Sequence, residues 1–237
     1  MSEVNGFAVV AHELKSPIST IRQLALGMDF DDLALCKQNR SKLISVSDHA
    51  IRQVNDLLKI SRLEDGLFEM EPVSARSICN DVLAELDDLF ISANRRISTK
   101  FTNRSHLVYA NREMLRSIIY NFCVNALNYS ESGTISEILV QDTKQRISRN
   151  RETDRVRISV RDFGPALPPS IWYKVRHDLY DIPEEIAMRP GNAGLGLYIS
   201  SQFSRAMNCQ ISAVRHKDGT TFSITLPVSE QLSLFGD

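Results

Sequence analysis

The chain has 237 residues, and its 28 lysines and arginines nearly balance 29 aspartates and glutamates, which leaves a net charge of −1. This balance argues against a general affinity for nucleic acid. No apolar run approaches the ~20 residues that span a bilayer. The four cysteines include no C-x-x-C pair, a pattern that favours reduced thiols over a disulfide framework. We therefore expect a cytoplasmic protein with no membrane segment, and we do not expect nucleic acid among its partners.

Residues 1–66 predict a helical hairpin. Apolar side chains recur at three- and four-residue steps from Phe7 to Met28 and again from Leu43 to Leu58. Pro17 predicts a kink in the first helix, and Gly66 is typical of the end of the second. Two apolar stripes do not close a core. Either a second copy completes a dimeric four-helix bundle, or the hairpin packs on the rest of its own chain.

Residues 67–229 predict a two-layer α/β sandwich, so the fold class is α+β. Mixed helices and largely antiparallel strands are typical of that architecture. Residues 144–155 are rich in basic side chains, and we interpret them as a long hairpin loop that is either solvated or in contact with a partner or nucleic acid. Helices are expected at 74–90, 112–129 and 195–207, and strands at 97–101, 106–110, 135–140, 156–161, 211–214 and 221–226.

His12 lies beside Glu13, with Pro17 about one helical turn later. A neutral imidazole can accept a phosphoryl group, and an adjacent carboxylate can hold its tautomer and take its proton. On a helical wheel His12 points away from the apolar stripe. The pair is therefore a candidate phosphoryl acceptor with its own base.

Asn121 and Asn125 are four residues apart in the predicted helix 112–129, so they share one face. Neutral amide oxygens suit a magnesium ion that already carries phosphate oxygens and water. The alternative is a structural role, in helix capping or a buried amide network.

Asp162 and Gly164 follow the predicted strand 156–161 directly. A carboxylate at a strand end can accept a hydrogen bond from an exocyclic amine such as that of adenine. Gly164 would let the backbone approach a flat ring. The alternative is an ordinary Asp-x-Gly turn.

Small residues from Gly191 to Gly196 lead into the predicted helix 195–207. The free N–H groups and the positive dipole end of a helix N-terminus bind phosphate. The alternative is a glycine-rich hinge without a chemical role.

In this order the four segments resemble the sensor histidine kinases of two-component signalling, over residues 5–228. The matching residues are His12-Glu13-x-x-x-Pro17, Asn121 with Asn125, Asp162-x-Gly164-Pro165 and Gly194-Leu195-Gly196-Leu197. The resemblance implies a histidine-bearing dimerisation hairpin (1–66) followed by an ATP-binding domain of the gyrase, Hsp90 and MutL type (67–229). It also implies ATP and Mg²⁺ as cofactors, a homodimer, and a response regulator receiver domain as partner.

The resemblance also implies roles for individual residues. His12 would attack the γ-phosphate of ATP, with Glu13 as base, and Ser16 stands where phosphatase activity is often supported. Asn125 would bind Mg²⁺. The other nucleotide-binding residues implied are Asn121, Asn128, Tyr129, Asp162, Gly164, Gly194, Leu195 and Gly196.

Several positions depart from the family pattern. Asn128 stands where a lysine is frequent, Ala166 replaces a second glycine, and Asn192 replaces the first glycine of the lid. These changes imply slow or conditional ATP turnover. The alternative function is a degenerate nucleotide-binding scaffold with weak or no kinase activity.

The tail 230–237 carries apolar residues where a free tail is usually polar. Gln231-Leu232-Ser233-Leu234-Phe235 resembles the short motif by which bacterial polymerases and repair proteins dock on the DNA sliding clamp. Either the tail makes a sliding clamp a candidate partner, or its apolar residues fold back on the domain or pair across a dimer.

Overall fold

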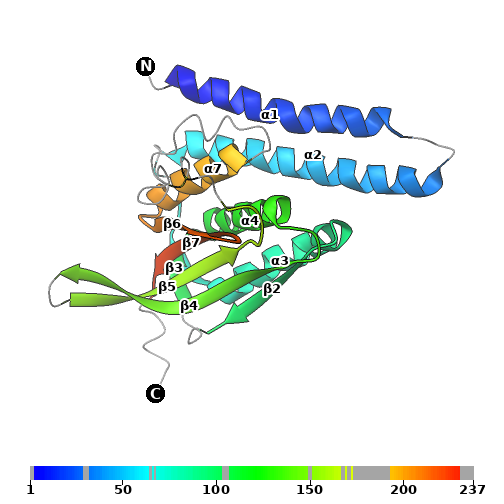
Figure 1. The fold of residues 1–237 in the computed structure, drawn as a ribbon. Coiled ribbons are helices and arrows are strands. Elements are labelled where there is room, and N and C mark those ends of the chain that lie inside the picture. The colour runs from blue at the N-terminus through cyan, green and yellow to red at the C-terminus, as the bar shows by residue number, and fades with distance from the viewer. Residues whose placement is uncertain are drawn as a thin grey trace. The chain divides into compact units, whose positions relative to one another are not determined.

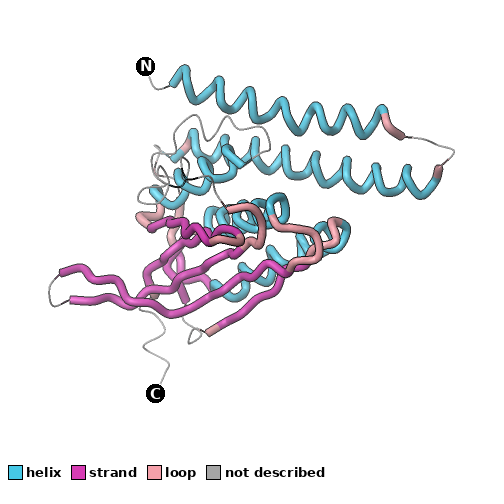
Figure 2. The backbone as a smooth tube through the Cα atoms, in the orientation of Figure 1, coloured by secondary structure: helices cyan, strands magenta, loops and turns pink. Residues whose placement is uncertain are grey.

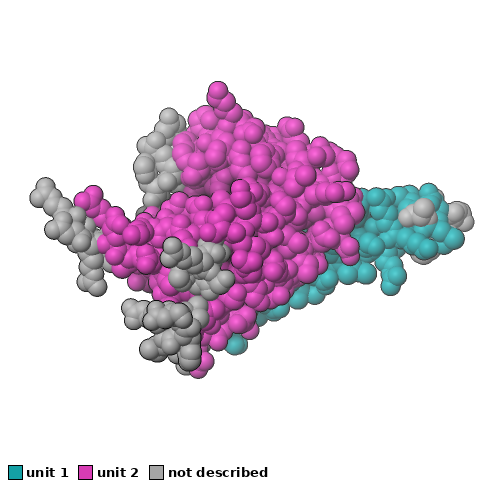
Figure 3. All heavy atoms as spheres, turned by 90° about the horizontal axis from the view of Figure 1, so that it is seen from below, with its two compact units in different colours: residues 1–65, 183–199 teal, residues 66–182, 200–237 magenta. Residues whose placement is uncertain are grey.

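The computed structural model describes residues 3–28, 32–63, 66, 68–102, 107–148, 151–166, 169, 172 and 193–229. The chain divides into two compact units, residues 1–65 with 183–199 and residues 66–182 with 200–237 (Figure 3). Within the described residues, no helix is both long enough and apolar enough to cross a membrane. The expected boundary between residues 66 and 67, and the separate tail, stay predictions.

The first unit contains a helical hairpin of α1 (Glu3–Leu26) and α2 (Leu33–Ser61), which pack side by side (Figure 1). α1 continues unbroken through Pro17, and the Oγ1 of Thr20 donates to the Ser16 carbonyl at 3.1 Å. α2 ends at Ser61, before Gly66, whose φ of +64° is the left-handed conformation common after helices.

Large apolar side chains of the hairpin remain exposed. On α2, Ile44, Ile51 and Leu58 are 48%, 60% and 54% exposed, and they recur every seven residues. Positions seven apart lie on one face of a helix, so they form a continuous stripe. On α1, Ile18 and Leu26 are also exposed. A single copy of the chain therefore leaves an apolar helix face in contact with solvent.

The second unit contains a five-stranded sheet in the order β2-β4-β5-β7-β6. β2 and β4 are parallel, whereas the other neighbours are antiparallel. A separate antiparallel pair joins β1 (Glu71–Ser74) to β3 (Leu107–Ala110). The strands of the larger sheet are β2 (Arg96–Phe101), β4 (Ile135–Ser148), β5 (Arg151–Arg161), β6 (Gln210–His216) and β7 (Gly219–Pro227).

Helices cover the sheet. α3 (Ala75–Ser92) and α4 (Arg112–Tyr129) pack against each other, α3 also contacts β2 and β4, and α4 contacts β5. A further helix is α7 (Ala193–Ala206). Helices combined with a mixed sheet make this an α+β fold, as expected from the sequence.

The core face of the sheet leads to the candidate site. Val156, Ile158 and Val160 are buried at alternate positions of β5, because successive side chains of a strand point to opposite faces. The next position in this alternation is Asp162, which is also buried. The apolar row of β5 therefore ends in a carboxylate.

The prediction of a loop at residues 144–155 is wrong. β4 and β5 extend through this segment as an antiparallel ribbon, with Lys144 opposite Asp154 and Arg146 opposite Glu152 (Figure 2). Opposite charges on facing strands favour pairing, and the Nζ of Lys144 lies 3.9 Å from Glu152 Oε2. The ribbon could not be predicted from the sequence, because charged side chains on both strands replace the apolar–polar alternation that is typical of a half-buried strand.

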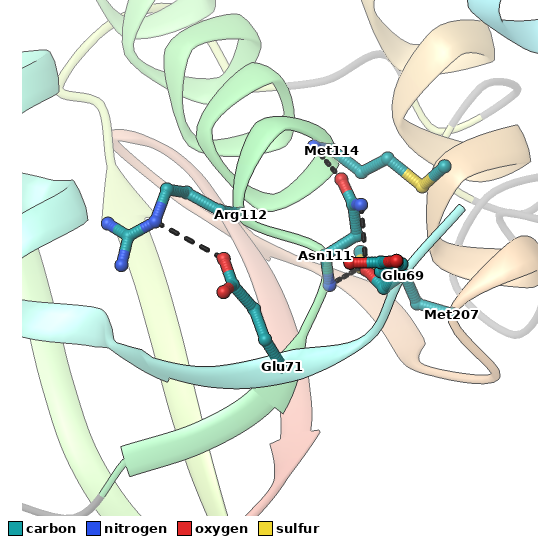
Figure 4. Close-up of polar contacts among 6 residues, drawn as sticks. All are labelled: Glu69, Glu71, Asn111, Arg112, Met114 and Met207. Atoms are coloured by element: carbon teal, nitrogen blue, oxygen red, sulfur yellow. Dashed lines mark hydrogen bonds and ion pairs between the residues drawn. The ribbon is translucent and has the colours of Figure 1, made fainter.

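Asn111 fixes the start of α4 (Figure 4). Its Oδ1 accepts from the Met114 N–H at 3.0 Å, and its Nδ2 donates to the Glu69 carbonyl at 2.8 Å. Its own N–H lies 3.4 Å from the Sδ of Met207. One side chain thus caps the helix and ties it to the segment before β1.

Replacing Asn111 by alanine is expected to lower the free energy of unfolding by about 1–2 kcal/mol, because the cap and the bond to Glu69 are lost together. The control is Arg112→Met, which removes only a half-exposed ion pair with Glu71 and should change stability by less than about 0.5 kcal/mol. Urea denaturation measures both. Equal losses in the two variants would show that the cap does not contribute.

Candidate nucleotide-binding site

Asn121 and Asn125 lie on one face of α4, and each is only 4% exposed. Neither Nδ2 has a hydrogen-bond partner within the described part of the chain. Buried amides are nearly always hydrogen-bonded, so these two Nδ2 groups are candidates for binding a ligand. Binding of a metal–phosphate ligand by this pair stays a prediction.

The two amides suit a metal–phosphate ligand. Rotation of an amide by 180° exchanges its oxygen and nitrogen, so Asn125 can present an oxygen to a cation and Asn121 an N–H to a phosphate. The described residues contain no cluster of three or more His, Cys, Asp or Glu side chains. A Mg²⁺ ion here would therefore take Asn125, phosphate oxygens and water as ligands, which is a donor set that Mg²⁺ accepts.

Main-chain hydrogen bonds hold Asp162 in place. Its Oδ1 accepts from the Thr220 N–H at 2.8 Å, and its own N–H donates to the Thr220 carbonyl at 2.9 Å. Burial raises the pKa of Asp162 to about 6, although the N–H groups of Thr220 and Gly164 and the charge of Arg161 favour the ionised form. Above pH 6 the site therefore presents a fixed carboxylate with lone pairs to spare.

Gly164 brings this segment against the end of α4. A Cβ atom at residue 164 would overlap the Tyr129 carbonyl oxygen, so only glycine fits. The Phe163 N–H donates to Ser130 Oγ at 3.2 Å, and the Phe163 carbonyl accepts from the Glu131 N–H at 2.8 Å. These contacts explain the glycine by packing on Tyr129 and place the Asp162 segment beside the last turn of α4.

The other two predicted residues of α4 are open to solvent. Asn128 is exposed, and Tyr129 is 39% exposed at the end of the helix. The structure therefore brings Tyr129 together with Asp162 and Gly164 at one end of α4, and leaves Asn128 free to reach a ligand from solvent.

The remaining predicted residues lie in the first unit. His12 and Glu13 belong to α1, but their side chains are outside the described residues, whereas Ser16 is half-buried. Gly194, Leu195 and Gly196 form the first turn of α7. The Leu195 side chain is fully buried, so any ligand contact there would come from its main chain. Gly191, Asn192 and the tail 230–237 lie outside the described residues.

Sequence reasoning missed the turn between β6 and β7 as part of the site. Gly219 has φ +138°, and a Cβ there would overlap the main-chain oxygen of Asp162 and lie 2.7 Å from its Oδ1. The sequence gave no sign that Thr220 binds Asp162 through its main chain. The one indication in the sequence that this turn packs closely against another segment was Gly219, at the start of the last strand.

Residues 110–230, just over half of the chain, match the family described as histidine kinase-, DNA gyrase B- and HSP90-like ATPase. The chain belongs to this family. It is also similar to sensor histidine kinases outside this segment. The histidine protein kinase SaeS of Staphylococcus aureus (strain USA300) is 26% identical over 234 residues, which cover 92% of this chain. The chain spans 61% of the length of SaeS.

Two solved structures share the fold. ShkA in complex with AMPPNP aligns with a TM-score of 0.58 and 21% identity, over 95% of this chain and 45% of that one. The histidine kinase ThkA in complex with the response regulator protein TrrA aligns with a TM-score of 0.59 and 17% identity, over 95% and 61%. At these identities the likeness establishes the fold alone.

Proposed function

We propose that the chain is an ATP-dependent protein histidine kinase that phosphorylates His12 and passes the phosphoryl group to an aspartate of a response regulator. The observation that carries this proposal is the pair of buried, unpaired amides at Asn121 and Asn125 in a fold of the histidine kinase type. The similarity to SaeS, which extends over the histidine-bearing hairpin, supports the same conclusion.

The residues divide the work of phosphoryl transfer. Asn125 holds Mg²⁺, Asn121 faces the phosphates, and Asp162 accepts the exocyclic amine of adenine. A bond from the His12 imidazole to the γ-phosphorus forms as the bond to ADP breaks, and Glu13 takes the imidazole proton. Such reactions depend mostly on positioning and on charge neutralisation by the metal.

The exposed stripe of Ile44, Ile51 and Leu58 supports a homodimer, because a second hairpin would remove it from water and complete a four-helix bundle. The complex of ThkA with TrrA supports a receiver domain as the phosphoryl acceptor. We assign dimerisation and the phosphorylated histidine to residues 1–66 and ATP binding to residues 67–229, in the cytoplasm.

Incubation with γ-labelled ATP and Mg²⁺ tests the proposal. The expected product is a label that is stable to base and labile to acid, because a phosphoramidate has this stability. Chelation of the metal by EDTA should abolish labelling. Binding of ADP without any label, under varied metal ions and with a receiver domain present, would overturn the kinase and leave a nucleotide-binding scaffold.

The tail adds a second candidate partner, the sliding clamp, through Gln231 to Phe235. An extended peptide of this composition would insert Leu234 and Phe235 into an apolar pocket, with Gln231 at its edge. A pull-down with the clamp should recover the intact chain and lose Leu234→Ala and Phe235→Ala, whereas Ser233→Ala serves as control. Equal recovery of all four would exclude this docking.

A further inference from the structure

The turn between β6 and β7 determines where the main-chain partner of Asp162 lies. Gly219 closes against Asp162 with no room for a side chain, and Thr220 follows it directly. Two hydrogen bonds, at 2.8 and 2.9 Å, then join Thr220 to Asp162. A displacement of this turn would therefore move the carboxylate.

Arg161 contacts this turn. Because successive side chains of a strand alternate, the Arg161 side chain lies on the face opposite to that of Asp162. Its Nη2 donates to Asp218 Oδ1 at 2.7 Å. Its Cζ lies 4.8 Å from the centroid of the Phe163 ring, within the range of a cation–π contact. The side chain adjacent to Asp162 thus contacts both the turn that binds the carboxylate and the residue that follows it in the chain.

From this arrangement we propose that Arg161 is a positioning residue for base recognition: it fixes the β6–β7 turn and Phe163, so that Asp162 keeps the orientation that adenine requires. The proposal rests on the nucleotide-binding role proposed above and extends it to a residue that would not touch the nucleotide.

The burial of Arg161 is difficult to explain by stability alone. Its side chain is 16% exposed, whereas that of Asp218 is 69% exposed. Its Nη1 is buried without a hydrogen-bond partner within the described residues. A buried, unpaired donor on a charged group is unfavourable. A planar guanidinium can bind the turn and lie on a ring at once, which the point charge of a lysine cannot do.

Phe163 transmits this restraint to α4. Its N–H donates to Ser130 Oγ, and Ser130 Oγ lies 3.0 Å from Ser136 Oγ in a buried contact. Its carbonyl accepts from the Glu131 N–H. The ring under Arg161 therefore belongs to the same segment that fixes Gly164 against Tyr129.

The charges around Asp162 give Arg161 an electrostatic signature. The positive charge of Arg161 lowers the pKa of Asp162, whereas the negative charge of Asp218 raises it. Loss of Arg161 should therefore shift the pKa of Asp162 upward, and loss of Asp218 should shift it downward. Other ionisable groups on the neighbouring elements are His216 before the turn, Glu131 after α4 and Glu137, which faces Arg161 from β4.

Calorimetric titration of the whole chain with ADP and Mg²⁺ tests the proposal. Arg161→Met should weaken binding about tenfold at pH 8, the usual order of loss when a supporting partner is removed. Arg161→Lys should fall between this variant and the wild type. Asp218→Asn should weaken binding about threefold, because that carboxylate is largely exposed. The control is Arg157→Met, on the same strand and face, which should bind ADP like the wild type.

Two further readouts separate positioning from a general loss of structure. The pH midpoint of ADP binding should rise in Arg161→Met and should not rise in Asp218→Asn. The preference for ADP over GDP should fall in Arg161→Met and stay unchanged in Arg157→Met. Wild-type affinity, pH midpoint and base preference in Arg161→Met would overturn the proposal.

The outcomes also distinguish this proposal from the proposed function. If the wild-type chain fails to bind ADP, nucleotide binding itself is wrong. If the wild type binds and Arg161→Met does not fold, Asp218→Asn decides, because it removes only the negative charge of one exposed partner and keeps an oxygen that can accept from Arg161. Wild-type ADP affinity in Asp218→Asn would then overturn the role of the ion pair.

Discussion

Replacing His12 by glutamine is expected to remove all acid-labile label from the chain while leaving its affinity for ADP unchanged. Glutamine keeps polarity and helix propensity but has no ring nitrogen that can carry a phosphoryl group. His12 lies in α1, in the first unit, whereas Asn121, Asn125 and Asp162 lie in the second. Phosphoryl acceptance and nucleotide binding should therefore respond separately to this change.

The matched control is His49→Gln on α2. Burial, together with the charge of Arg52, lowers the pKa of His49 to about 4, so this imidazole is neutral at pH 7 and is chemically able to accept a phosphoryl group. We expect its replacement to leave the label in place. If the label survives in His12→Gln and disappears in His49→Gln, the phosphoryl acceptor is His49, on the second helix of the hairpin.

Glu13→Gln refines the first result. If Glu13 takes the proton from the imidazole, the Glu13→Gln variant should be labelled about a hundredfold more slowly, because a general base usually contributes a factor of this size. Labelling should not be abolished. Initial rates of labelling at saturating ATP measure this loss. An unchanged rate would leave water or another group as the base.

The sequence predicted the helices of the ATPase-like unit well because their signals are local. Helix 112–129 was predicted with the bounds that the structure gives to α4, and Asn111 caps its start. By contrast, the parallel pairing of β2 with β4 has no local signal, because it depends on a connection through β3 and α4.

The candidate site divides in the same way. Asn121, Asn125, Asp162 and Gly164 could be proposed from short motifs, because the residue type at each of these positions suggests a chemical role by itself. The partner of Asp162 was missed, because Thr220 is 58 residues away and contributes a main-chain N–H that no residue type reveals. The role of Gly164 against Tyr129 depends equally on the packed structure.

Asp162→Asn is expected to have opposite effects on binding and on stability. Asparagine can still accept from the Thr220 N–H, but its Nδ2 would face the exocyclic amine of adenine as a second donor. A site that presents a donor where an acceptor is needed should lose at least about a hundredfold in ADP affinity. Calorimetric titration at pH 8 measures this loss, and Asp154→Asn, at an exposed position on the strand that precedes Asp162, is the control.

The same substitution should raise the stability of the fold, since burial raises the pKa of Asp162 from 3.8 to about 6. The folded state then holds a proton that the unfolded state has released between these values, so this residue destabilises the fold increasingly as pH rises from about 4 to 6. The neutral amide avoids this effect. The variant should exceed the wild type by about 1–2 kcal/mol in unfolding free energy at pH 8, and the difference should disappear near pH 4.

Urea denaturation at both pH values tests the sign. A variant less stable than the wild type at pH 8 would mean that the hydrogen bonds from Thr220 and Gly164 to the carboxylate outweigh its burial. Unchanged ADP affinity would remove Asp162 from base recognition. We expect the variant to be more stable and to bind ADP more weakly. This pair of results is expected if the carboxylate of Asp162 serves ligand binding and lowers the stability of the fold.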